Sequence, residues 1–149
     1  MEELQVIKEM QDVFQFLHSE DKLQSLYPDS LTKIEIKLAS LLGSLGELVA
    51  ESNKSVNDLE AERKFLFAKS YTDFKKISLE RETKLTTNDL ENLAEMNIKQ
   101  NRLSENQAHY QYERLKYWWE TVNVMINSLK MRTKYLIKEE ISTPTREAS

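Results

Sequence analysis

The chain has 149 residues, of which 31% are charged, and its formal net charge is −4 at pH 7. Two glycines and two prolines are too few for a β-sandwich, a barrel or a βαβ array, and no apolar run approaches the ~20 residues that cross a bilayer. The absence of cysteine excludes disulfides and Cys-ligated zinc, and the acidic start does not fit a signal peptide, so we expect a cytoplasmic protein.

Residues 1–28 are predicted to form an acidic N-terminal helix. Within residues 2–26, apolar side chains recur three and four apart, which places them on one helix face: Ile7, Met10, Phe14 and Leu17. Residues 1–30 carry seven acidic and two basic side chains, a net charge of −5. Tyr27 ends this helix, because Pro28 disfavours the α conformation of the residue before it. His18 is interpreted as a cap at the helix C-terminus.

A second helix is predicted from near Leu31 to about Arg81, with Asp29 or Ser30 as its N-cap. Its apolar residues alternate three and four apart, as in a coiled-coil seam: Leu31, Ile34, Leu38, Leu41, Leu45 and Leu48. The two glycines, at positions 43 and 46, lie within this row. They indicate a bend or the close approach of another helix, or alternatively a true break.

A chain reversal is predicted at residues 84–88. Asn88 can cap the next helix while Glu91 reaches back three residues, as in a capping box. From Leu90 to about Lys138 there is no glycine or proline, which predicts one long third helix. Its apolar face comprises Leu115, Trp118 or Trp119, Val122, Met125 or Ile126, Leu129 and Leu136. Residues 141–149 have no apolar period and are predicted to be a flexible tail.

These elements predict an all-α, coiled-coil-like fold in which residues 29–140 form a long antiparallel helical hairpin. A helix of ~50 residues is ~75 Å long, so a hairpin would leave apolar surface uncovered at its ends. Further copies of the chain are expected to cover this surface, which predicts a homo-oligomer. The alternative is a monomeric bundle of three or four helices that are broken more often.

Two basic segments occur in this acidic chain. Residues 63–81 carry six basic and two acidic side chains, net +4, and residues 114–138 carry six basic and one acidic, net +5. Aromatic residues gather in or next to them: Phe65, Phe67, Tyr71, Phe74, Tyr110, Tyr112, Tyr117, Trp118, Trp119 and Tyr135. Because cations bind phosphates and rings stack on unpaired bases, this combination indicates single-stranded nucleic acid. The alternative is core packing, which is the favoured interpretation for Phe65, Trp118 and Trp119.

No catalytic cluster is recognisable in the sequence. His109 shares a helix face with Glu105 and Glu113, but a di-iron site requires a second histidine on another helix. Residues 43–46 lack the glycine spacing and the Lys-Ser/Thr ending of a phosphate-binding loop. We therefore expect no metal, no cofactor and no enzymatic activity.

Two stretches of sequence carry a resemblance to a known family. The first, at residues 66–74, reads Leu-Phe-Ala-Lys-Ser-Tyr-Thr-Asp-Phe. The second has an aromatic cluster at 117–119, an apolar run at 122–129 and a basic stretch at 130–132. In both, the chain resembles the UvsY-type recombination mediators of phages, small helical proteins that assemble into rings, over about residues 59–138. Phe67 stands where the family motif has a Lys, and Lys69 where it has an Arg.

The resemblance implies a protein of the host cytoplasm that binds single-stranded DNA, displaces a single-strand binding protein and helps a RecA-type recombinase to nucleate its filament. It also implies an oligomer interface on the third helix: Leu115, Trp118, Trp119, Val122, Met125, Ile126 and Leu129. With the charge pattern, it nominates as DNA-binding residues Arg63, Lys64, Lys69, Tyr71, Lys75, Lys76, Arg81, Arg132 and Lys134. The competing hypothesis is a coiled-coil scaffold or adaptor, including a phage inhibitor of a host nucleic-acid machine. Its acidic residues 1–30 would contact a basic partner or fold against the basic segments of the chain.

Overall fold

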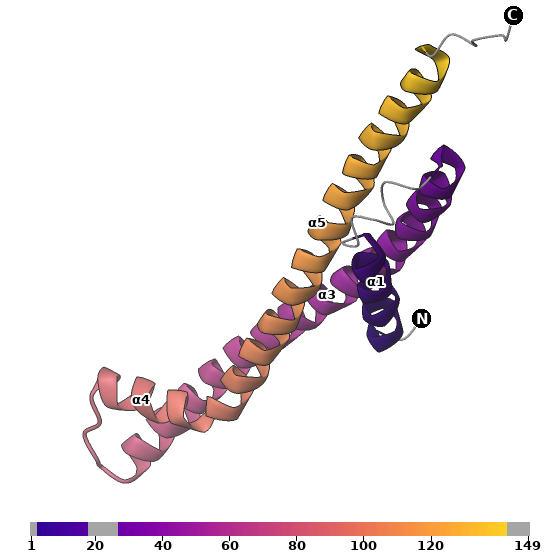
Figure 1. Cartoon of the computed structure of the whole chain (residues 1–149). Coiled ribbons are helices and arrows are strands. Elements are labelled where there is room, and N and C mark those ends of the chain that lie inside the picture. The colour runs from indigo at the N-terminus through magenta and orange to yellow at the C-terminus, as the bar shows by residue number, and fades with distance from the viewer. Residues whose placement is uncertain (1–2, 18–26, 143–149) are drawn as a thin grey trace, which may run out of the picture. The chain divides into compact units, whose positions relative to one another are not determined.

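The computed structural model describes residues 3–17 and 27–142, and these fold almost entirely into helices. The helices are α1 (Glu3–Leu17), α3 (Pro28–Glu80), α4 (Thr87–Asn97) and α5 (Lys99–Ser142), as Figure 1 shows. No strand occurs in the described ranges. The prediction of an all-α fold is therefore confirmed.

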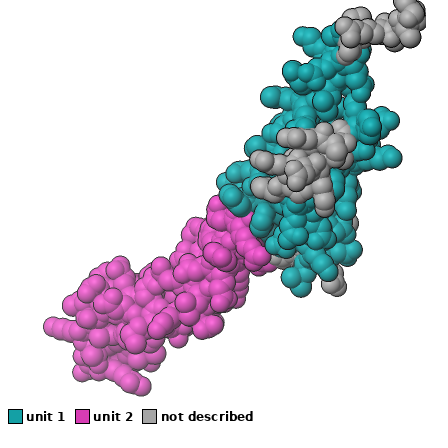
Figure 2. Space-filling view, in the orientation of Figure 1, with its two compact units in different colours: residues 1–49, 115–149 teal, residues 50–114 magenta. Residues whose placement is uncertain are grey.

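The chain divides into two compact units (Figure 2). Unit 1 comprises residues 1–49 and 115–149, and unit 2 comprises residues 50–114. Unit 1 thus holds α1 with the first part of α3 and most of α5. Unit 2 holds the remainder of α3, all of α4 and the first turns of α5.

The apolar core of unit 1 lies where α1, α3 and α5 pack together (Figure 1). Nine of its buried members belong to the predicted apolar faces: Met10, Leu31, Leu38, Leu41, Leu45, Leu115, Val122, Ile126 and Leu129. Val6 and Val13 of α1 are also buried there, although the predicted face of that helix did not include them. Phe14 of α1 packs against Trp118 of α5, with the ring centroids 5.8 Å apart. The hydroxyl of Thr133 also donates a hydrogen bond of 2.6 Å to the carboxylate of Glu35. The spacing of apolar residues therefore identified the α3 and α5 parts of this core and one of its three buried α1 members.

The beginning of α3 differs from its prediction. The helix starts at Pro28 rather than near Leu31, because proline suits the first turn, where its missing N–H is not needed. The carbonyl oxygen of Tyr27 accepts hydrogen bonds from the N–H groups of Ser30 and Leu31, at 3.0 and 3.2 Å. Residues 18–26, which include His18 and the predicted end of the N-terminal helix, lie outside the described residues, as does most of the predicted tail.

Neither glycine breaks α3, which is unbroken from Pro28 to Glu80. A Cβ atom on Gly46 would lie 3.5 Å from Nε1 of Trp119, so this glycine sits where α5 comes close. A Cβ atom on Gly43 would meet nothing within 4 Å. Of the two interpretations, close helix approach is confirmed at Gly46, and the true break is wrong.

Unit 2 is held together by a mixture of apolar and polar contacts. Among its described residues, the buried apolar side chains are Val56, Leu90, Ala94 and Ile98. Unit 2 also contains an ion pair of Arg63 with Glu105 and a 2.7 Å hydrogen bond that Asn97 donates to Ser70. In unit 1, Glu35 and Gly46 of α3 lie beside Thr133 and Trp119, and in unit 2, Arg63 and Ser70 of α3 contact Glu105 and Asn97. Residues later in α3 therefore contact residues earlier in the following helices, which confirms the antiparallel hairpin.

The reversal between α3 and α4 occupies residues 81–86 and uses a different cap from the predicted one. The N–H groups of Thr83 and Glu82 donate to the carbonyls of Ser78 and Leu79, as in a Schellman motif, and Glu82 has a φ of 51°. Thr86, rather than Asn88, is the N-cap of α4, and Asp89 replaces Glu91 in the capping box. Threonine caps well and Asp89 lies three residues after it, so the same motif is satisfied two residues earlier.

The predicted third helix is interrupted once, at Ile98, and therefore forms two helices, α4 and α5. Buried residues of this stretch are spaced four apart, at Leu90, Ala94 and Ile98. In a straight helix such a row drifts by about 40° at each step. At Ile98, the last member of this row, the backbone leaves the helical conformation with φ −99° and ψ 9°, and a pair between Glu95 and Arg102 spans the interruption.

Candidate nucleic-acid interface

One face of α3 in unit 2 presents cations and an aromatic ring to solvent. The buried row of α3 runs through Val56 and Ser70, and the opposite side of the helix is exposed. We call this side the α3 basic face and define it by Lys64, Phe65, Lys69, Lys75 and Lys76. Phe65 is 66% exposed, so it does not pack in the core as the sequence predicted.

Three lysines of the α3 basic face are accessible to a ligand. Lys69, Lys75 and Lys76 are exposed and form no ion pair with any other described residue. Lys64 instead pairs with Glu60 one turn away, and this contact, helped by Arg63 and His109, lowers the pKa of the Glu60 carboxyl. The face therefore offers three available ammonium groups.

Other predicted DNA-binding residues of this segment are placed differently. The Arg63 guanidinium donates to Glu105 through Nε, and its side chain is only 20% exposed, so Arg63 helps to hold unit 2 together and is not counted in the α3 basic face. Tyr71 and Phe74 are half-buried, which leaves only part of each ring accessible. Arg81 is exposed in the turn after α3.

The second basic segment lies mainly in unit 1, on α5. Lys130, Arg132 and Lys134 are exposed there. Two tyrosines are also largely exposed, Tyr117 at 63% and Tyr135 at 62%. A hydrogen bond to the Glu139 carboxylate raises the pKa of the Tyr135 hydroxyl. The first basic segment therefore belongs to unit 2, and the second, apart from Arg114, belongs to unit 1.

The residues predicted to form an oligomer interface are covered within one chain. Leu115, Val122, Ile126 and Leu129 are buried in the core of unit 1, and Trp118 and Met125 pack against that core. Trp119 is 37% exposed and lies beside Gly46. Their apolar surface thus has an intramolecular partner in α1 and α3, in agreement with the core packing favoured for Trp118.

A row of exposed apolar residues on α5 was missed by the sequence analysis. In unit 1, Tyr117, Val124 and Met131 follow one another at intervals of seven residues and are 63–72% exposed. An interval of seven keeps side chains on nearly the same face of a helix. This spacing is the signal that could have identified the row before the structure was known.

The structure describes no constellation of metal ligands. His109 is exposed, and Glu105 on the same face is engaged by Arg63. Within the described residues, no group of three or more His, Cys, Asp or Glu side chains is placed to hold a metal ion. No described helix carries an apolar stretch long enough to span a membrane.

Comparisons with protein families, with curated proteins and with solved structures find no match for this chain.

Proposed function

We propose that the protein binds single-stranded DNA through the α3 basic face and acts as a recombination mediator that helps to load a RecA-type recombinase. The observation that carries the DNA-binding part is an exposed phenylalanine on the same helix face as three lysines that form no ion pair with any described residue. The mediator role rests on the resemblance to UvsY-type proteins.

The physics of this face favours a single strand without sequence preference. Each lysine that neutralises a phosphate releases a counterion, so three contacts give a slope of log affinity against log salt of roughly −2. A ring that stacks on an unpaired base contributes about 1–3 kcal/mol whichever base it meets. Phe65 supplies such a ring, and the paired bases of a duplex would not offer it a free face.

A titration of a labelled oligonucleotide at two salt concentrations tests the DNA-binding part. We expect the triple variant Lys69→Glu, Lys75→Glu, Lys76→Glu to lose at least tenfold in affinity, and Phe65→Ala to weaken binding without changing the salt dependence. The matched control is Lys8→Glu, Lys54→Glu, Lys99→Glu, which alters the net charge equally at other exposed lysines. Equal losses in both triple variants would mean that only the net charge matters, and the proposed site would be wrong.

The mediator role needs a separate assay. DNA-dependent ATP hydrolysis by a RecA-type recombinase is measured on a strand already coated with a single-strand binding protein. We expect the wild-type chain to shorten the lag, and the lysine triple variant to lose this effect. DNA binding without any effect on the lag would refute the mediator role and leave the DNA-binding site standing.

A second candidate function is that of a coiled-coil adaptor, and the exposed row on α5 favours it. Tyr117, Val124 and Met131 offer a partner helix one contact every two turns. Under this alternative, serine at all three positions abolishes partner binding, whereas the lysine triple variant keeps it. The two functions therefore predict opposite responses to the two sets of substitutions.

A further inference from the structure

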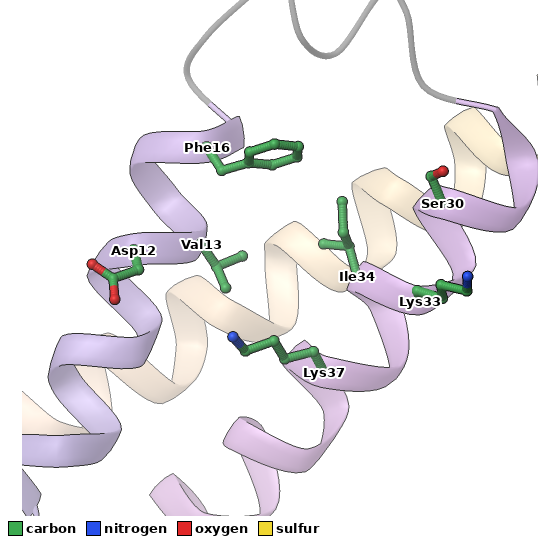
Figure 3. A pocket seen from close by; sticks show the side chains of 7 residues that line it. All are labelled: Asp12, Val13, Phe16, Ser30, Lys33, Ile34 and Lys37. Atoms are coloured by element: carbon green, nitrogen blue, oxygen red, sulfur yellow. The ribbon is translucent and has the colours of Figure 1, made fainter.

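A groove lies between α1 and the first turns of α3 in unit 1 (Figure 3). Its volume is about 450 Å³. Seven residues line it: Asp12, Val13 and Phe16 from α1, and Ser30, Lys33, Ile34 and Lys37 from α3. All of them belong to the described part of unit 1.

The floor of the groove is apolar, and one of its walls is cationic. Val13, Phe16 and Ile34 direct their side chains into the space between the two helices (Figure 3). Lys33 and Lys37 stand on either side of Ile34 on α3, and both are exposed. Neither lysine forms an ion pair with another described residue. Among the described residues, an apolar groove thus lies beside two cations that form no ion pair with any of them.

We infer that this groove binds an acidic peptide segment in which a bulky apolar side chain has acidic residues on both sides. The apolar side chain would bury itself against Ile34 and Phe16. The flanking carboxylates would then meet Lys33 and Lys37, whose charges have no other described partner. Charge complementarity with the two lysines therefore favours peptides with acidic residues at the flanking positions. Burial of apolar area favours a bulky apolar residue at the central position.

The same groove is poorly suited to nucleic acid. Asp12 lines the α1 side of the groove. The phosphodiester backbone of a nucleic acid carries a negative charge at every nucleotide, so the Asp12 carboxylate would repel it. Residues 1–30 as a whole carry a net charge of −5, which also repels a polyanion. A peptide places only a few charges at chosen positions, so it can contact the lysine wall alone.

Fluorescence anisotropy with a labelled peptide tests this inference. The probe is Gly-Ser-Asp-Asp-Phe-Asp-Asp-Ser-Gly, and its controls replace the Phe by Ser or all four Asp by Asn. With the full chain we expect saturable binding of the probe and at least tenfold weaker binding of each control peptide. Equal binding of the Phe and Ser peptides would overturn the groove as the site, because charge alone would explain the signal.

Variants of the protein locate the site. Lys33→Ala with Lys37→Ala should weaken probe binding at least tenfold, and so should Phe16→Ala. Lys8→Ala with Lys130→Ala is the charge-matched control and should change it less than twofold. Far-UV circular dichroism checks that each variant remains helical. Unchanged binding to the Lys33 and Lys37 variant would overturn the inference.

The inference stands apart from the proposed function. The triple substitution of Lys69, Lys75 and Lys76 should leave peptide binding intact, whereas the Lys33 and Lys37 variant should keep its affinity for single-stranded DNA. If an unlabelled oligonucleotide displaces the probe, and its own binding falls in the Lys33 and Lys37 variant, the groove binds nucleic acid and the peptide assignment is wrong.

Discussion

Arg63 illustrates how a single cation can serve the fold instead of a ligand. From the sequence it belongs to the basic segment 63–81, but in unit 2 its guanidinium is bound by Glu105, forty-two residues away. Nothing in the local pattern around Arg63 indicates so distant a partner. The side chain of Phe65, by contrast, could have been placed correctly. It lies off the helix row formed by Val56, Arg63 and Ser70, which follow one another at intervals of seven residues.

The Arg63–Glu105 pair provides the first prediction. Glu105→Ala should destabilise the chain by about 1.5–3 kcal/mol, because it leaves a largely buried guanidinium without its charged acceptor. Replacing both partners, by Arg63→Met with Glu105→Leu, should cost less than either single change, since no buried charge then remains. Denaturant unfolding of the two single variants and the double variant measures the coupling. Additive effects would show that the two side chains do not depend on each other.

The capping box at Thr86 gives a prediction about pH. Hydrogen bonds from the Thr86 hydroxyl and N–H lower the pKa of the Asp89 carboxyl. A carboxyl whose pKa is lower in the folded state stabilises that state above its unfolded pKa. This stabilisation disappears as the pH falls through the lowered value. The carboxyl carbon chemical shift of Asp89, followed by NMR, should titrate below its ordinary range, and Thr86→Ala should return it towards that range. An identical titration in the variant would contradict the assigned cause.

At the scale of elements, the sequence predicted the helices better than their ends. Long rows of apolar residues three and four apart identified α3 and the core-facing part of α5, because burial of a continuous face dominates over local preferences. The interruption at Ile98 has no glycine or proline to signal it, so the sequence pattern could not reveal it. The cap of α4 shifted from Asn88 to Thr86 because two neighbouring residues could each satisfy the motif.

Glu82 supports a prediction on the end of α3. Its φ of 51° is one that residues with a Cβ atom rarely adopt and that glycine adopts freely. Glu82→Gly should therefore stabilise the chain by about 0.5–1 kcal/mol. This net figure already subtracts the larger loss of conformational entropy that glycine undergoes on folding. Glu80→Gly, inside the last turn of the helix, is the control and should destabilise by a similar amount. Thermal unfolding compares the two, and a lower melting temperature for Glu82→Gly would refute the argument.

At the scale of the whole molecule, the two units differ in what holds them together. Unit 1 contains every buried member of the core cluster, whereas the described part of unit 2 combines four buried apolar residues with an ion pair and an amide–hydroxyl hydrogen bond. The sequence indicated this difference only indirectly, since leucines are dense in residues 31–48 and sparse after residue 59. Where polar groups would meet was not predictable, because each pair joins residues far apart in the chain.

Hydrogen exchange should reveal the difference between the units. Amides of α3 in residues 56–74 are expected to exchange at least tenfold faster than those in residues 31–45, because less apolar surface must be exposed to open them. Mass spectrometry of exchanged peptides from the full chain measures both stretches in one experiment. Uniform protection along α3 would mean that the chain opens as a single cooperative body.

Both connections between the units run through unbroken helix, at Val49–Ala50 in α3 and at Arg114–Leu115 in α5. Adding one residue at either connection would rotate the later side chains of that helix by about 100° relative to the earlier ones, whereas Arg63 and Glu105, both within unit 2, would keep their pairing. Seven residues added to each arm would leave the apolar rows of both helices almost in phase. Chains that share this architecture should thus vary in length by heptads inserted in pairs, a rule that can be checked wherever such genes are aligned.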